Sequence, residues 1–370
     1  MPVNILAVGD PHFKNSNIPE VELFIEKMEK LASELEPDLI VILGDLLDEH
    51  ERIHTIPLNK AYEFINKMRA ISKTYVLVGN HDMINHLQFL TENHWMNAMK
   101  EWVDVTIVDT VICEIIKGEK LIFAPYVAPG RFIEALSTLE EEWKDASIIF
   151  PHQEFFGCKM GAIISEEGDK WDLDYPNIVS GHIHLNQTPQ KNIYYPGSSM
   201  QHAFGESEKN IIPFLKIENK KYELEEIDLK LPRKKILYMD VDSVDDYTIP
   251  EKSEDKIKVS ISGVYEEFKT FKKTKKYKEL VKKGVKVVFK PKRSEQKMKN
   301  ESLSKIIEDT NESSNFKEII SNIISTNKDP YLFEVYEFII NDNIVKSWVK
   351  AFAAKSSDDD IRKYIIASSI

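Results

Sequence analysis

One pattern, repeated five times, constrains the fold of this 370-residue chain more than any other feature. In each repeat, a short apolar run ends directly in a residue whose side chain can bind a metal ion. The runs are residues 6–8 before Asp10 and His12, 40–43 before Asp45, 76–78 before Asn80, His81 and Asp82, 148–150 before His152, and 178–180 before His182 and His184. Because they are short and rich in β-branched residues, they predict buried strands rather than helices.

The segments between these strands complete an α/β pattern. Helical periodicity covers residues 19–35, which begin with a proline, and residues 58–71. Residues 211–229 have the pattern of two closing antiparallel strands. In an α/β sheet, ligands bind at the carboxyl ends of the strands, so we expect the polar residues to converge there. Residues 1–231 are therefore predicted to form one catalytic domain.

The converging side chains are carboxylates, an amide and imidazoles, with no thiolate. This set favours a divalent ion such as manganese, iron or zinc. Two ions about 3.5–4 Å apart can share a carboxylate, activate a water and stabilise both oxygens of an in-line displacement. Each residue alone has an ordinary explanation, since Gly-Asp and Gly-Asn are common in turns. Five in succession, each at a strand end, favour a metal centre.

A second part of the chain begins at a turn near residue 232. Strand-like segments at 256–262 and 285–289 flank a helical pattern at 265–283, which predicts a small α/β cap over residues 232–293. Residues 294–314 are polar and predict a linker, and residues 315–370 predict a helical region. Its apolar stripe, at i, i+3, i+4 and i+7, predicts either a partner-binding face or the core of a small bundle; it consists of Val345, Trp348, Val349 and Phe352.

The charge distribution divides the chain into an acidic body and one basic element. A net charge of −12 argues at first against a nucleic-acid partner. Residues 269–293, however, contain twelve basic residues and one acidic residue, a net charge of +11. The rest of the chain therefore has a net charge of −23. The helical part of this segment predicts DNA contacts through Lys272, Lys273, Lys275 and Lys276. A solvated helix face is the alternative.

Cysteine content and hydropathy predict a protein of a reducing, intracellular compartment. Cys113 and Cys158 are the two cysteines, so no disulfide framework is expected. No apolar run approaches the roughly 20 residues that a membrane helix needs. The first residues carry no basic lead and predict a strand rather than a signal peptide. We therefore expect a location in the cytoplasm, or in the nucleus of a eukaryotic cell.

The motifs as a set resemble the calcineurin-like metallophosphoesterases, a family with a β-sandwich flanked by helices. Within it, the chain most resembles the SbcD-type nuclease subunit of the double-strand-break repair complex. This narrower resemblance depends on residues 194–198, with the sequence YYPGS, on residues 204–206, with the sequence FGE, and on the cap and helical tail.

The resemblance implies a role for each motif residue. It implies two divalent ions, most often manganese. One would bind Asp10, His12 and His184, and the other Asn80, His152 and His182, with Asp45 bridging both. His81 would assist departure of the leaving oxygen, and Asp82 would orient His81 or its loop. Asp48 occupies a position where some relatives have histidine, which leaves the positioning of the phosphate open.

The resemblance also implies substrate and partners. It implies a DNA endo- and exonuclease that acts with an SbcC-like ATPase of the ABC class. The helical tail would bind the coiled-coil base of this ATPase. His202 is a candidate for touching substrate. A stripe of Leu87, Leu90, Trp95 and Met99 predicts either core or the face of a homodimer. The alternatives are a phosphomonoesterase or cyclic-nucleotide phosphodiesterase with the same ligands, and a metal-free scaffold, which would be expected to lack ligands.

Overall fold

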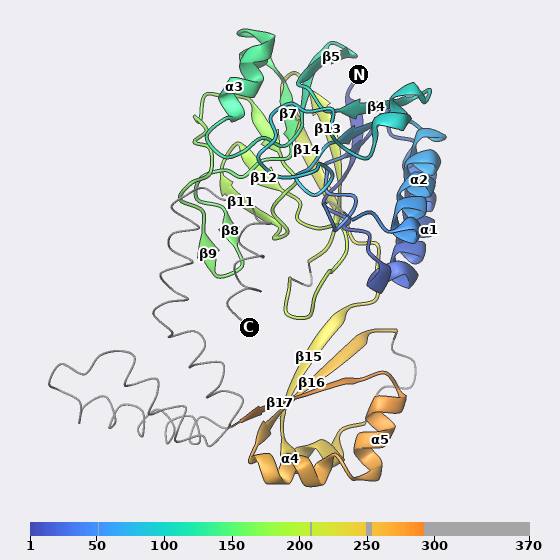
Figure 1. Ribbon diagram of the computed structural model, residues 1–370. Helices are drawn as coiled ribbons and strands as arrows, with labels where there is room; N and C mark the ends of the chain where they lie inside the picture. Colours follow the sequence, from blue (N-terminus) through green and yellow to red (C-terminus); the bar gives the residue numbers. More distant parts are fainter. Residues whose placement is uncertain (51, 208, 249–253, 292–370) are drawn as a thin grey trace, which may run out of the picture. The chain divides into compact units, whose positions relative to one another are not determined.

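The computed structural model describes residues 1–50, 52–207, 209–248 and 254–291 (Figure 1). The chain divides into two units; the first consists of Met1–Ile261 with Thr270–Val288, and the described residues of the second are Ser262–Lys269 and 289–291. The predicted linker at 294–314 and the predicted helical region at 315–370, including the stripe around Trp348, lie outside the described residues.

Two six-stranded sheets form the body of the first unit. In the first sheet, four neighbouring strands are parallel and two antiparallel strands close one edge. In order across the sheet they are β14 (Lys221–Ile227), β13 (Ile212–Glu218), β1 (Val3–Val8), β2 (Leu39–Ile42), β3 (Lys73–Leu77) and β4 (Val105–Val108). The antiparallel pair β13–β14 confirms the strands predicted over residues 211–229.

The second sheet has four parallel strands between two antiparallel edge strands. Its order is β11 (Gln187–Gln190), β12 (Ile193–Tyr195), β10 (Asn177–Val179), β7 (Ile148–Pro151), β6 (Glu119–Ala124) and β5 (Ile112–Ile116). A separate short hairpin is formed by β8 (Lys159–Met160) and β9 (Ile163–Ile164). All five apolar runs that predicted strands are strands of these two sheets.

The two sheets pack face to face around one buried cluster. Side chains from β1, β2 and β3 meet side chains from β6, β7 and β10 in it. The rings of Tyr75 and Phe123, one from each sheet, are stacked with centroids 4.1 Å apart and planes 2° apart. Alternate residues of each strand face outward, as the two-residue period of a strand requires, and helices and loops cover them. The fold is therefore the predicted β-sandwich flanked by helices.

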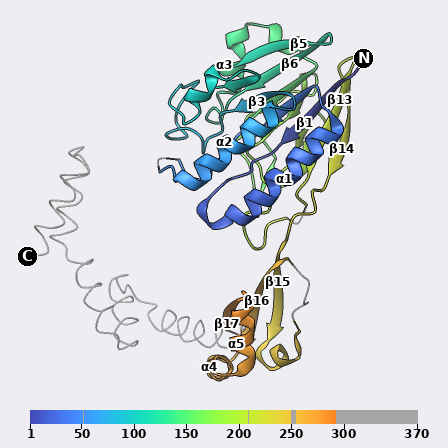
Figure 2. The same ribbon diagram turned by 90° about the vertical axis from the view of Figure 1, so that its right-hand side faces the viewer.

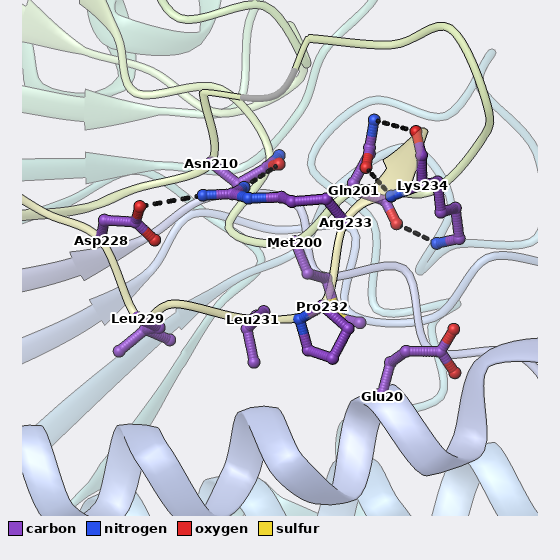
Figure 3. Close-up of a pocket in the computed structure, with 10 residues that line it drawn as sticks. All are labelled: Glu20, Met200, Gln201, Asn210, Asp228, Leu229, Leu231, Pro232, Arg233 and Lys234. Atoms are coloured by element: carbon purple, nitrogen blue, oxygen red, sulfur yellow. Dashed lines mark hydrogen bonds and ion pairs between the residues drawn. The ribbon is translucent and has the colours of Figure 1, made fainter. Parts of the chain in front are cut away.

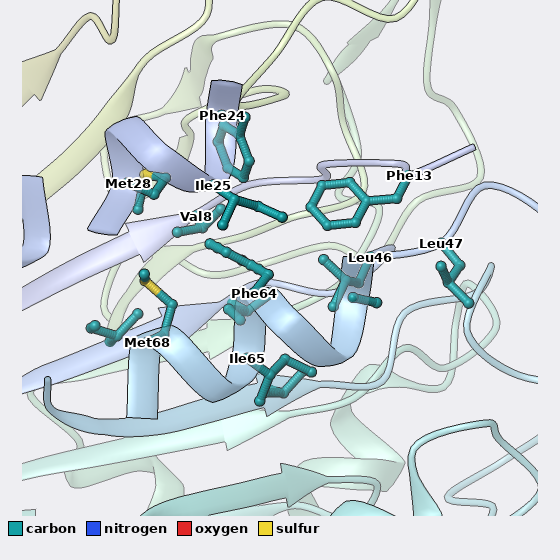
Figure 4. Packing of buried hydrophobic residues seen from close by; sticks show 14 of the residues in the cluster. Val8, Phe13, Phe24, Ile25, Met28, Leu46, Leu47, Phe64, Ile65 and Met68 are labelled. Atoms are coloured by element: carbon teal, nitrogen blue, oxygen red, sulfur yellow. The ribbon is translucent and has the colours of Figure 1, made fainter. Parts of the chain in front are cut away.

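Helices α1 (Ile18–Leu35) and α2 (Thr55–Arg69) lie side by side on the outer face of the first sheet (Figure 2). Their apolar stripes pack onto alternate residues of the strands, and Figure 4 shows Phe24 of α1 and Phe64 of α2 meeting beside Val8. The centroids of these two phenylalanine rings are 5.3 Å apart. Helix α1 ends where Glu36 adopts a left-handed conformation. Both predicted helices are confirmed.

The outer face of the second sheet is covered by α3 (Phe132–Leu136) and by loops that contribute Trp143 and Trp171. Short 3-10 helices complete the connections: η1 (Asn15–Asn17), η2 (Asn97–Glu101), η3 (Ser137–Leu139), η4 (Glu142–Asp145) and η5 (Val241–Asp246). None of the helices within the described ranges combines the length and apolar character that a bilayer crossing requires.

Beyond the sandwich, β15 (Lys234–Asp240), β16 (Lys256–Gly263) and β17 (Lys286–Pro291) form a three-stranded sheet in that order. The single helix predicted for residues 265–283 is wrong, because the structure has α4 (Tyr265–Phe271) and α5 (Lys275–Lys282). The hydroxyl of Thr274 accepts a hydrogen bond from the backbone N–H of Tyr277 at 3.2 Å and caps α5. A cap of this kind starts a new helix. Strand β15 was not predicted.

Candidate metal centre

The structure brings all seven predicted ligands together at the carboxyl ends of β1, β2, β3, β7 and β10. The two sheets contribute to one cluster because their parallel strands end on the same side of the sandwich. The amide oxygen of Asn80 lies 2.8 Å from His182 Nδ1 and 3.1 Å from His152 Nε2. Asp10 accepts the backbone N–H of His182 at 2.8 Å. Side chains from positions 172 residues apart thus share one site.

Asp45 lies between two groups of potential ligands. Its Oδ2 atom is 3.2 Å from His152 Nε2 and 3.6 Å from His12 Nε2. Three sets of side chains among the described residues offer ligand atoms within 4.8 Å of one another, and Asp45 belongs to two of them: one with His152 and His182, the other with His12 and His81. A carboxylate shared in this way is the arrangement that a two-ion site requires.

The backbone at the cluster is held in an uncommon conformation. Asp10, His12, Asp45 and His182 have φ values of 38°, 44°, 49° and 77°. Residues with a Cβ rarely adopt this left-handed region, and such strain concentrates at functional sites. Four of the seven predicted ligands share it, which indicates that the surrounding structure holds them in place for a purpose other than stability.

Two glycines let the chain approach the ligands closely. A Cβ atom on Gly79 would lie 2.2 Å from Asp45 Oδ1 and 2.4 Å from the Asp45 backbone nitrogen. Gly44 has φ +100°, and a Cβ there would lie 2.4 Å from His152 Nδ1. Gly44 and Gly79 are therefore required by close packing at the metal centre itself.

The donor set fits divalent ions. Asp10 Oδ2 is buried and has no hydrogen-bond partner among the described residues. The Nε2 atoms of His12 and His184 face each other at 3.0 Å, so at least one must carry a proton or both must face a cation. Oxygen and nitrogen donors without thiolate suit manganese, iron or zinc. Unpaired buried polar atoms are costly, and an ion would satisfy them.

The protonation states also fit cation binding. Burial lowers the pKa of His182 to about 3 and that of His184 to about 4, so both imidazoles are neutral, as metal ligands must be. Burial raises the pKa of Asp10 to about 7. Burial would lower the pKa of His152, but Asp45 outweighs it and raises the value to about 9. A cation beside these groups would reverse both of the last two shifts.

His81 lies beside the cluster and is held from two sides. Its backbone N–H donates to Asp45 Oδ1 at 2.8 Å, and its Nδ1 atom lies 2.7 Å from the carbonyl oxygen of Asp48. Its ring is stacked on that of His50, with centroids 4.4 Å apart, and meets His12 edge-on at 4.8 Å. Burial lowers the pKa of the His81 imidazole. The free nitrogen of the ring is therefore Nε2.

Asp82 and Asp48 support the loops around His81. Asp82 accepts hydrogen bonds from the backbone N–H of Gly79 at 3.1 Å and from the indole of Trp95 at 2.9 Å. Asp48 accepts from Lys14 at 2.9 Å and lies 3.4 Å from His12 Nδ1. Burial would raise the pKa of Asp48, but His12 and Lys14 lower it well below its usual range. Both carboxylates thus brace residues of the cluster.

Sequence reasoning missed two neighbours of the centre. His50 belongs to none of the five motifs, and the structure stacks it on His81. The ring of Tyr126 lies 5.4 Å from that of His182, and its backbone N–H donates to Val78 at 2.8 Å. Tyr126 follows β6 just as the ligands follow their strands, so the same signal could have found it. His202, a predicted substrate contact, lies among His12 and His184.

Two large cavities adjoin the centre, and no residue lines both. One, of about 960 Å³, is lined by His182, His184 and the β8–β9 hairpin. The other, of about 560 Å³, is lined by Asp48, His50 and Arg52. The pocket drawn in Figure 3 holds only about 10 Å³, lies around Arg233 and touches none of the predicted ligands.

The remaining predicted residues lie elsewhere. Lys272, Lys273 and Lys275 are exposed and Lys276 is half-buried, at and just before the start of α5. The stripe proposed as core or dimer face is split, because Leu87 is 73% exposed whereas Met99 is fully buried. Its residues lie on turns and on η2 rather than along one helix. They do not form a single face.

Comparisons with known proteins agree with this site. The family model of the calcineurin-like phosphoesterases matches residues 3–186, which contain all seven predicted ligands. The chain is 46% identical over 331 residues to "Putative phosphoesterase 078R" of Invertebrate iridescent virus 3, covering 88% of this chain and 93% of that protein. The chain belongs to the calcineurin-like phosphoesterase family, and it is a metal-dependent hydrolase of phosphoester bonds.

Two further comparisons are with a second viral relative and with a solved structure. The chain is 48% identical over 278 residues to "Putative phosphoesterase 244L" of Invertebrate iridescent virus 6, covering 73% of this chain and 98% of that protein. A solved structure of Yfce, a phosphoesterase from E. coli, aligns with a TM-score of 0.30 at 16% identity, over 58% of this chain and 88% of the other. The family assignment rests on the sequence relatives.

Proposed function

We propose that the chain is a two-ion phosphodiesterase that cuts DNA, using manganese. The observation that carries the two-ion site is the position of Asp45 between the His152–His182 group and the His12–His81 group. When bound, two divalent ions lower the pKa of a water and stabilise the charge that develops on the phosphate. Asp10, His12 and His184 would hold one ion, Asn80, His152 and His182 the other, and Asp45 both.

His81 is proposed to supply the proton for the leaving oxygen. The carbonyl oxygen of Asp48 accepts the proton on His81 Nδ1, because a carbonyl cannot donate. In the neutral ring Nε2 then has the lone pair, so His81 would act as an acid in its protonated, imidazolium form. The Nε2–H of that form would pass its proton to the oxygen whose bond to phosphorus breaks, while water forms the new bond. His50, stacked on the ring, limits its rotation. A positioned imidazole suits acid catalysis near neutral pH.

The two cavities favour a diester over a monoester. The phosphorus of a diester carries two organic groups, and each needs space beside the ions. One cavity is bounded by His182 and His184, the other by His50, the neighbour of His81. Together the two cavities offer space for the nucleotides on both sides of a cleaved phosphate. A monoester would use one of them.

The basic segment supports a nucleic-acid substrate. Residues 269–293 carry a net charge of +11 in a chain of net charge −12. Exposed lysines at Lys272, Lys273 and Lys275 can neutralise backbone phosphates without reading sequence. We further propose an ATPase partner of the SbcC-like class, bound through Val345, Trp348, Val349 and Phe352, and a homodimer. These two proposals rest on the sequence pattern and the resemblance.

The test is a comparison of substrates with each of three metals. Purified protein would be incubated with linear and closed circular DNA, with bis-p-nitrophenyl phosphate and with p-nitrophenyl phosphate, in manganese, magnesium or zinc. We expect cleavage of DNA and of the diester, strongest with manganese, and slow cleavage of the monoester. Rapid hydrolysis of the monoester with intact DNA would instead establish a phosphomonoesterase.

A further inference from the structure

His202 is placed in the same way as a metal-binding histidine. Its Nε2 atom lies 2.9 Å from the carbonyl oxygen of Asp10. Because a carbonyl only accepts, the proton of the neutral ring is on Nε2 and Nδ1 has the lone pair. That Nδ1 atom is buried and has no hydrogen-bond partner among the described residues. Metal-binding histidines typically donate one ring N–H to a carbonyl or carboxylate and present the other nitrogen to the ion.

The predicted ligand His152 shows the same arrangement. Its Nδ1 atom lies 2.6 Å from the carbonyl oxygen of Leu43, and its Nε2 atom faces Asn80 and Asp45. The two histidines thus share one pattern, in which one ring nitrogen donates a hydrogen bond to a backbone carbonyl near a strand end. In His152 the second nitrogen has ligand neighbours, and the same is expected of the unpartnered nitrogen of His202.

His202 lies beside two further predicted ligands. Its ring centroid is 4.9 Å from that of His12 and 5.2 Å from that of His184, both edge-on. One nitrogen of each of the three rings lies within 4.8 Å of a nitrogen of the others. Three imidazole nitrogens this close can bind one cation together.

The loop that carries His202 is fixed on both sides. The carboxylate of Glu206 accepts the backbone N–H groups of His202 at 2.8 Å and of Ala203 at 2.9 Å. On the other side, the buried Gln201 accepts the backbone N–H of Lys234 at 2.6 Å and donates to its carbonyl at 3.4 Å (Figure 3). A metal ligand must be held in a fixed position by its surroundings, and these hydrogen bonds fix the loop of His202.

We propose that His202, through Nδ1, is an additional ligand of the ion held by Asp10, His12 and His184. The inference rests on the proposed two-ion site and extends it, because the resemblance assigns this position no ligand and the sequence suggested only a substrate contact. An extra imidazole makes the two ion positions unequal. It favours ions that bind imidazole well, such as zinc or iron, over magnesium, which prefers oxygen.

Two variants separate ligation from support of the Asp10 loop. In His202→Gln, the amide nitrogen can replace Nε2 as the donor to the Asp10 carbonyl, but nothing replaces Nδ1. In His202→Ala both functions are lost. Metal-free protein, checked for folding by circular dichroism, would be titrated with Mn²⁺ while free Mn²⁺ is followed by electron paramagnetic resonance. His54→Ala is the matched control, because His54 is half exposed and pairs with Glu49 instead.

We expect wild type and the control to bind two ions per chain. Both His202 variants should bind one of the two at least about tenfold more weakly and lose one nitrogen hyperfine coupling from the bound Mn²⁺. Wild-type affinity in His202→Gln with loss only in His202→Ala would overturn the inference, since the side chain would then act only by holding Asp10. Unchanged affinity and couplings in both variants would also overturn it. A wild-type chain that binds no ion would overturn the proposed function, and the inference with it.

Discussion

His81 Nδ1 lies 2.7 Å from the backbone carbonyl oxygen of Asp48, and this contact leaves Nε2 as the ring nitrogen that can contact substrate. A backbone carbonyl cannot change its role as acceptor, so the tautomer of His81 is fixed by the main chain. Asp48 is itself held by Lys14. The proposed acid is thus oriented by parts of the structure that do not take part in the reaction.

The first prediction concerns His81→Ala. Cleavage of DNA, whose leaving alkoxide needs a proton, should slow by about 10²–10⁴-fold, the usual contribution of acid catalysis. The number of bound ions should not change, because the predicted ligands remain. Steady-state kinetics and elemental analysis of the same preparation measure both quantities. Loss of an ion from the variant would show that His81 is a ligand, which its position near His12 and Asp45 also allows.

The second prediction concerns Gly79→Ala. The new Cβ would lie 2.2 Å from Asp45 Oδ1 and 2.4 Å from its backbone nitrogen, so Asp45 must move. Affinity for both ions should fall, because Asp45 is proposed to bind both. Calorimetric titration with Mn²⁺ measures the change.

Gly130→Ala is the control for Gly79→Ala. Gly130 has φ +84°, and a Cβ there would meet nothing within 4 Å. This substitution should cost stability, on the order of 1 kcal/mol through backbone strain, and leave ion binding intact. Equal ion affinity in the two variants would contradict the proposed position of Asp45.

The third prediction concerns the basic segment. Lysine-to-glutamate reversal at Lys272, Lys273, Lys275 and Lys276 should weaken DNA binding and flatten its dependence on salt, because fewer counterions are released. Hydrolysis of the small diester should hardly change. Fluorescence anisotropy with labelled duplex across salt concentrations gives the slope. A control variant with the same change in net charge reverses four exposed lysines outside this segment, Lys30, Lys191, Lys216 and Lys221. The same slope in both variants would favour a solvated helix face.

The fourth prediction concerns the carboxyl-terminal stripe, which lies outside the described residues. Trp348→Ala with Phe352→Ala should abolish co-purification with the proposed ATPase and spare nuclease activity of the isolated chain, because aromatic anchors dominate binding energy. Affinity capture and gel assays measure the two effects. A double variant that aggregates by itself would show that the stripe is a core.

The metal centre could be predicted from sequence because its residues follow strands that are apolar and continuous. A buried run such as residues 40–43 shows where a strand ends, and Asp45 follows at once. Parallel strands then bring these ends together without any further information. The same reasoning placed α1 and α2, whose apolar stripes are regular.

Features that depend on long-range contacts or on single capping residues were not predictable in this way. The break between α4 and α5 depends on the hydroxyl of Thr274, which a helical periodicity does not reveal. His50 and His202 follow no strand, and only the folded chain brings them to His81 and His12. Strand β15 has one side exposed, with Tyr238 70% accessible, so its pattern was not recognisable as a buried run.

Anomalous diffraction from crystals grown with Mn²⁺ tests the central claim most directly. We expect two peaks per chain about 3.5–4 Å apart, one on each side of the Asp45 carboxylate. Crystals of Asp45→Asn grown in the same way should lose both peaks or retain one at low occupancy. A single peak in the wild-type chain, or two peaks that do not share Asp45, would contradict the two-ion site.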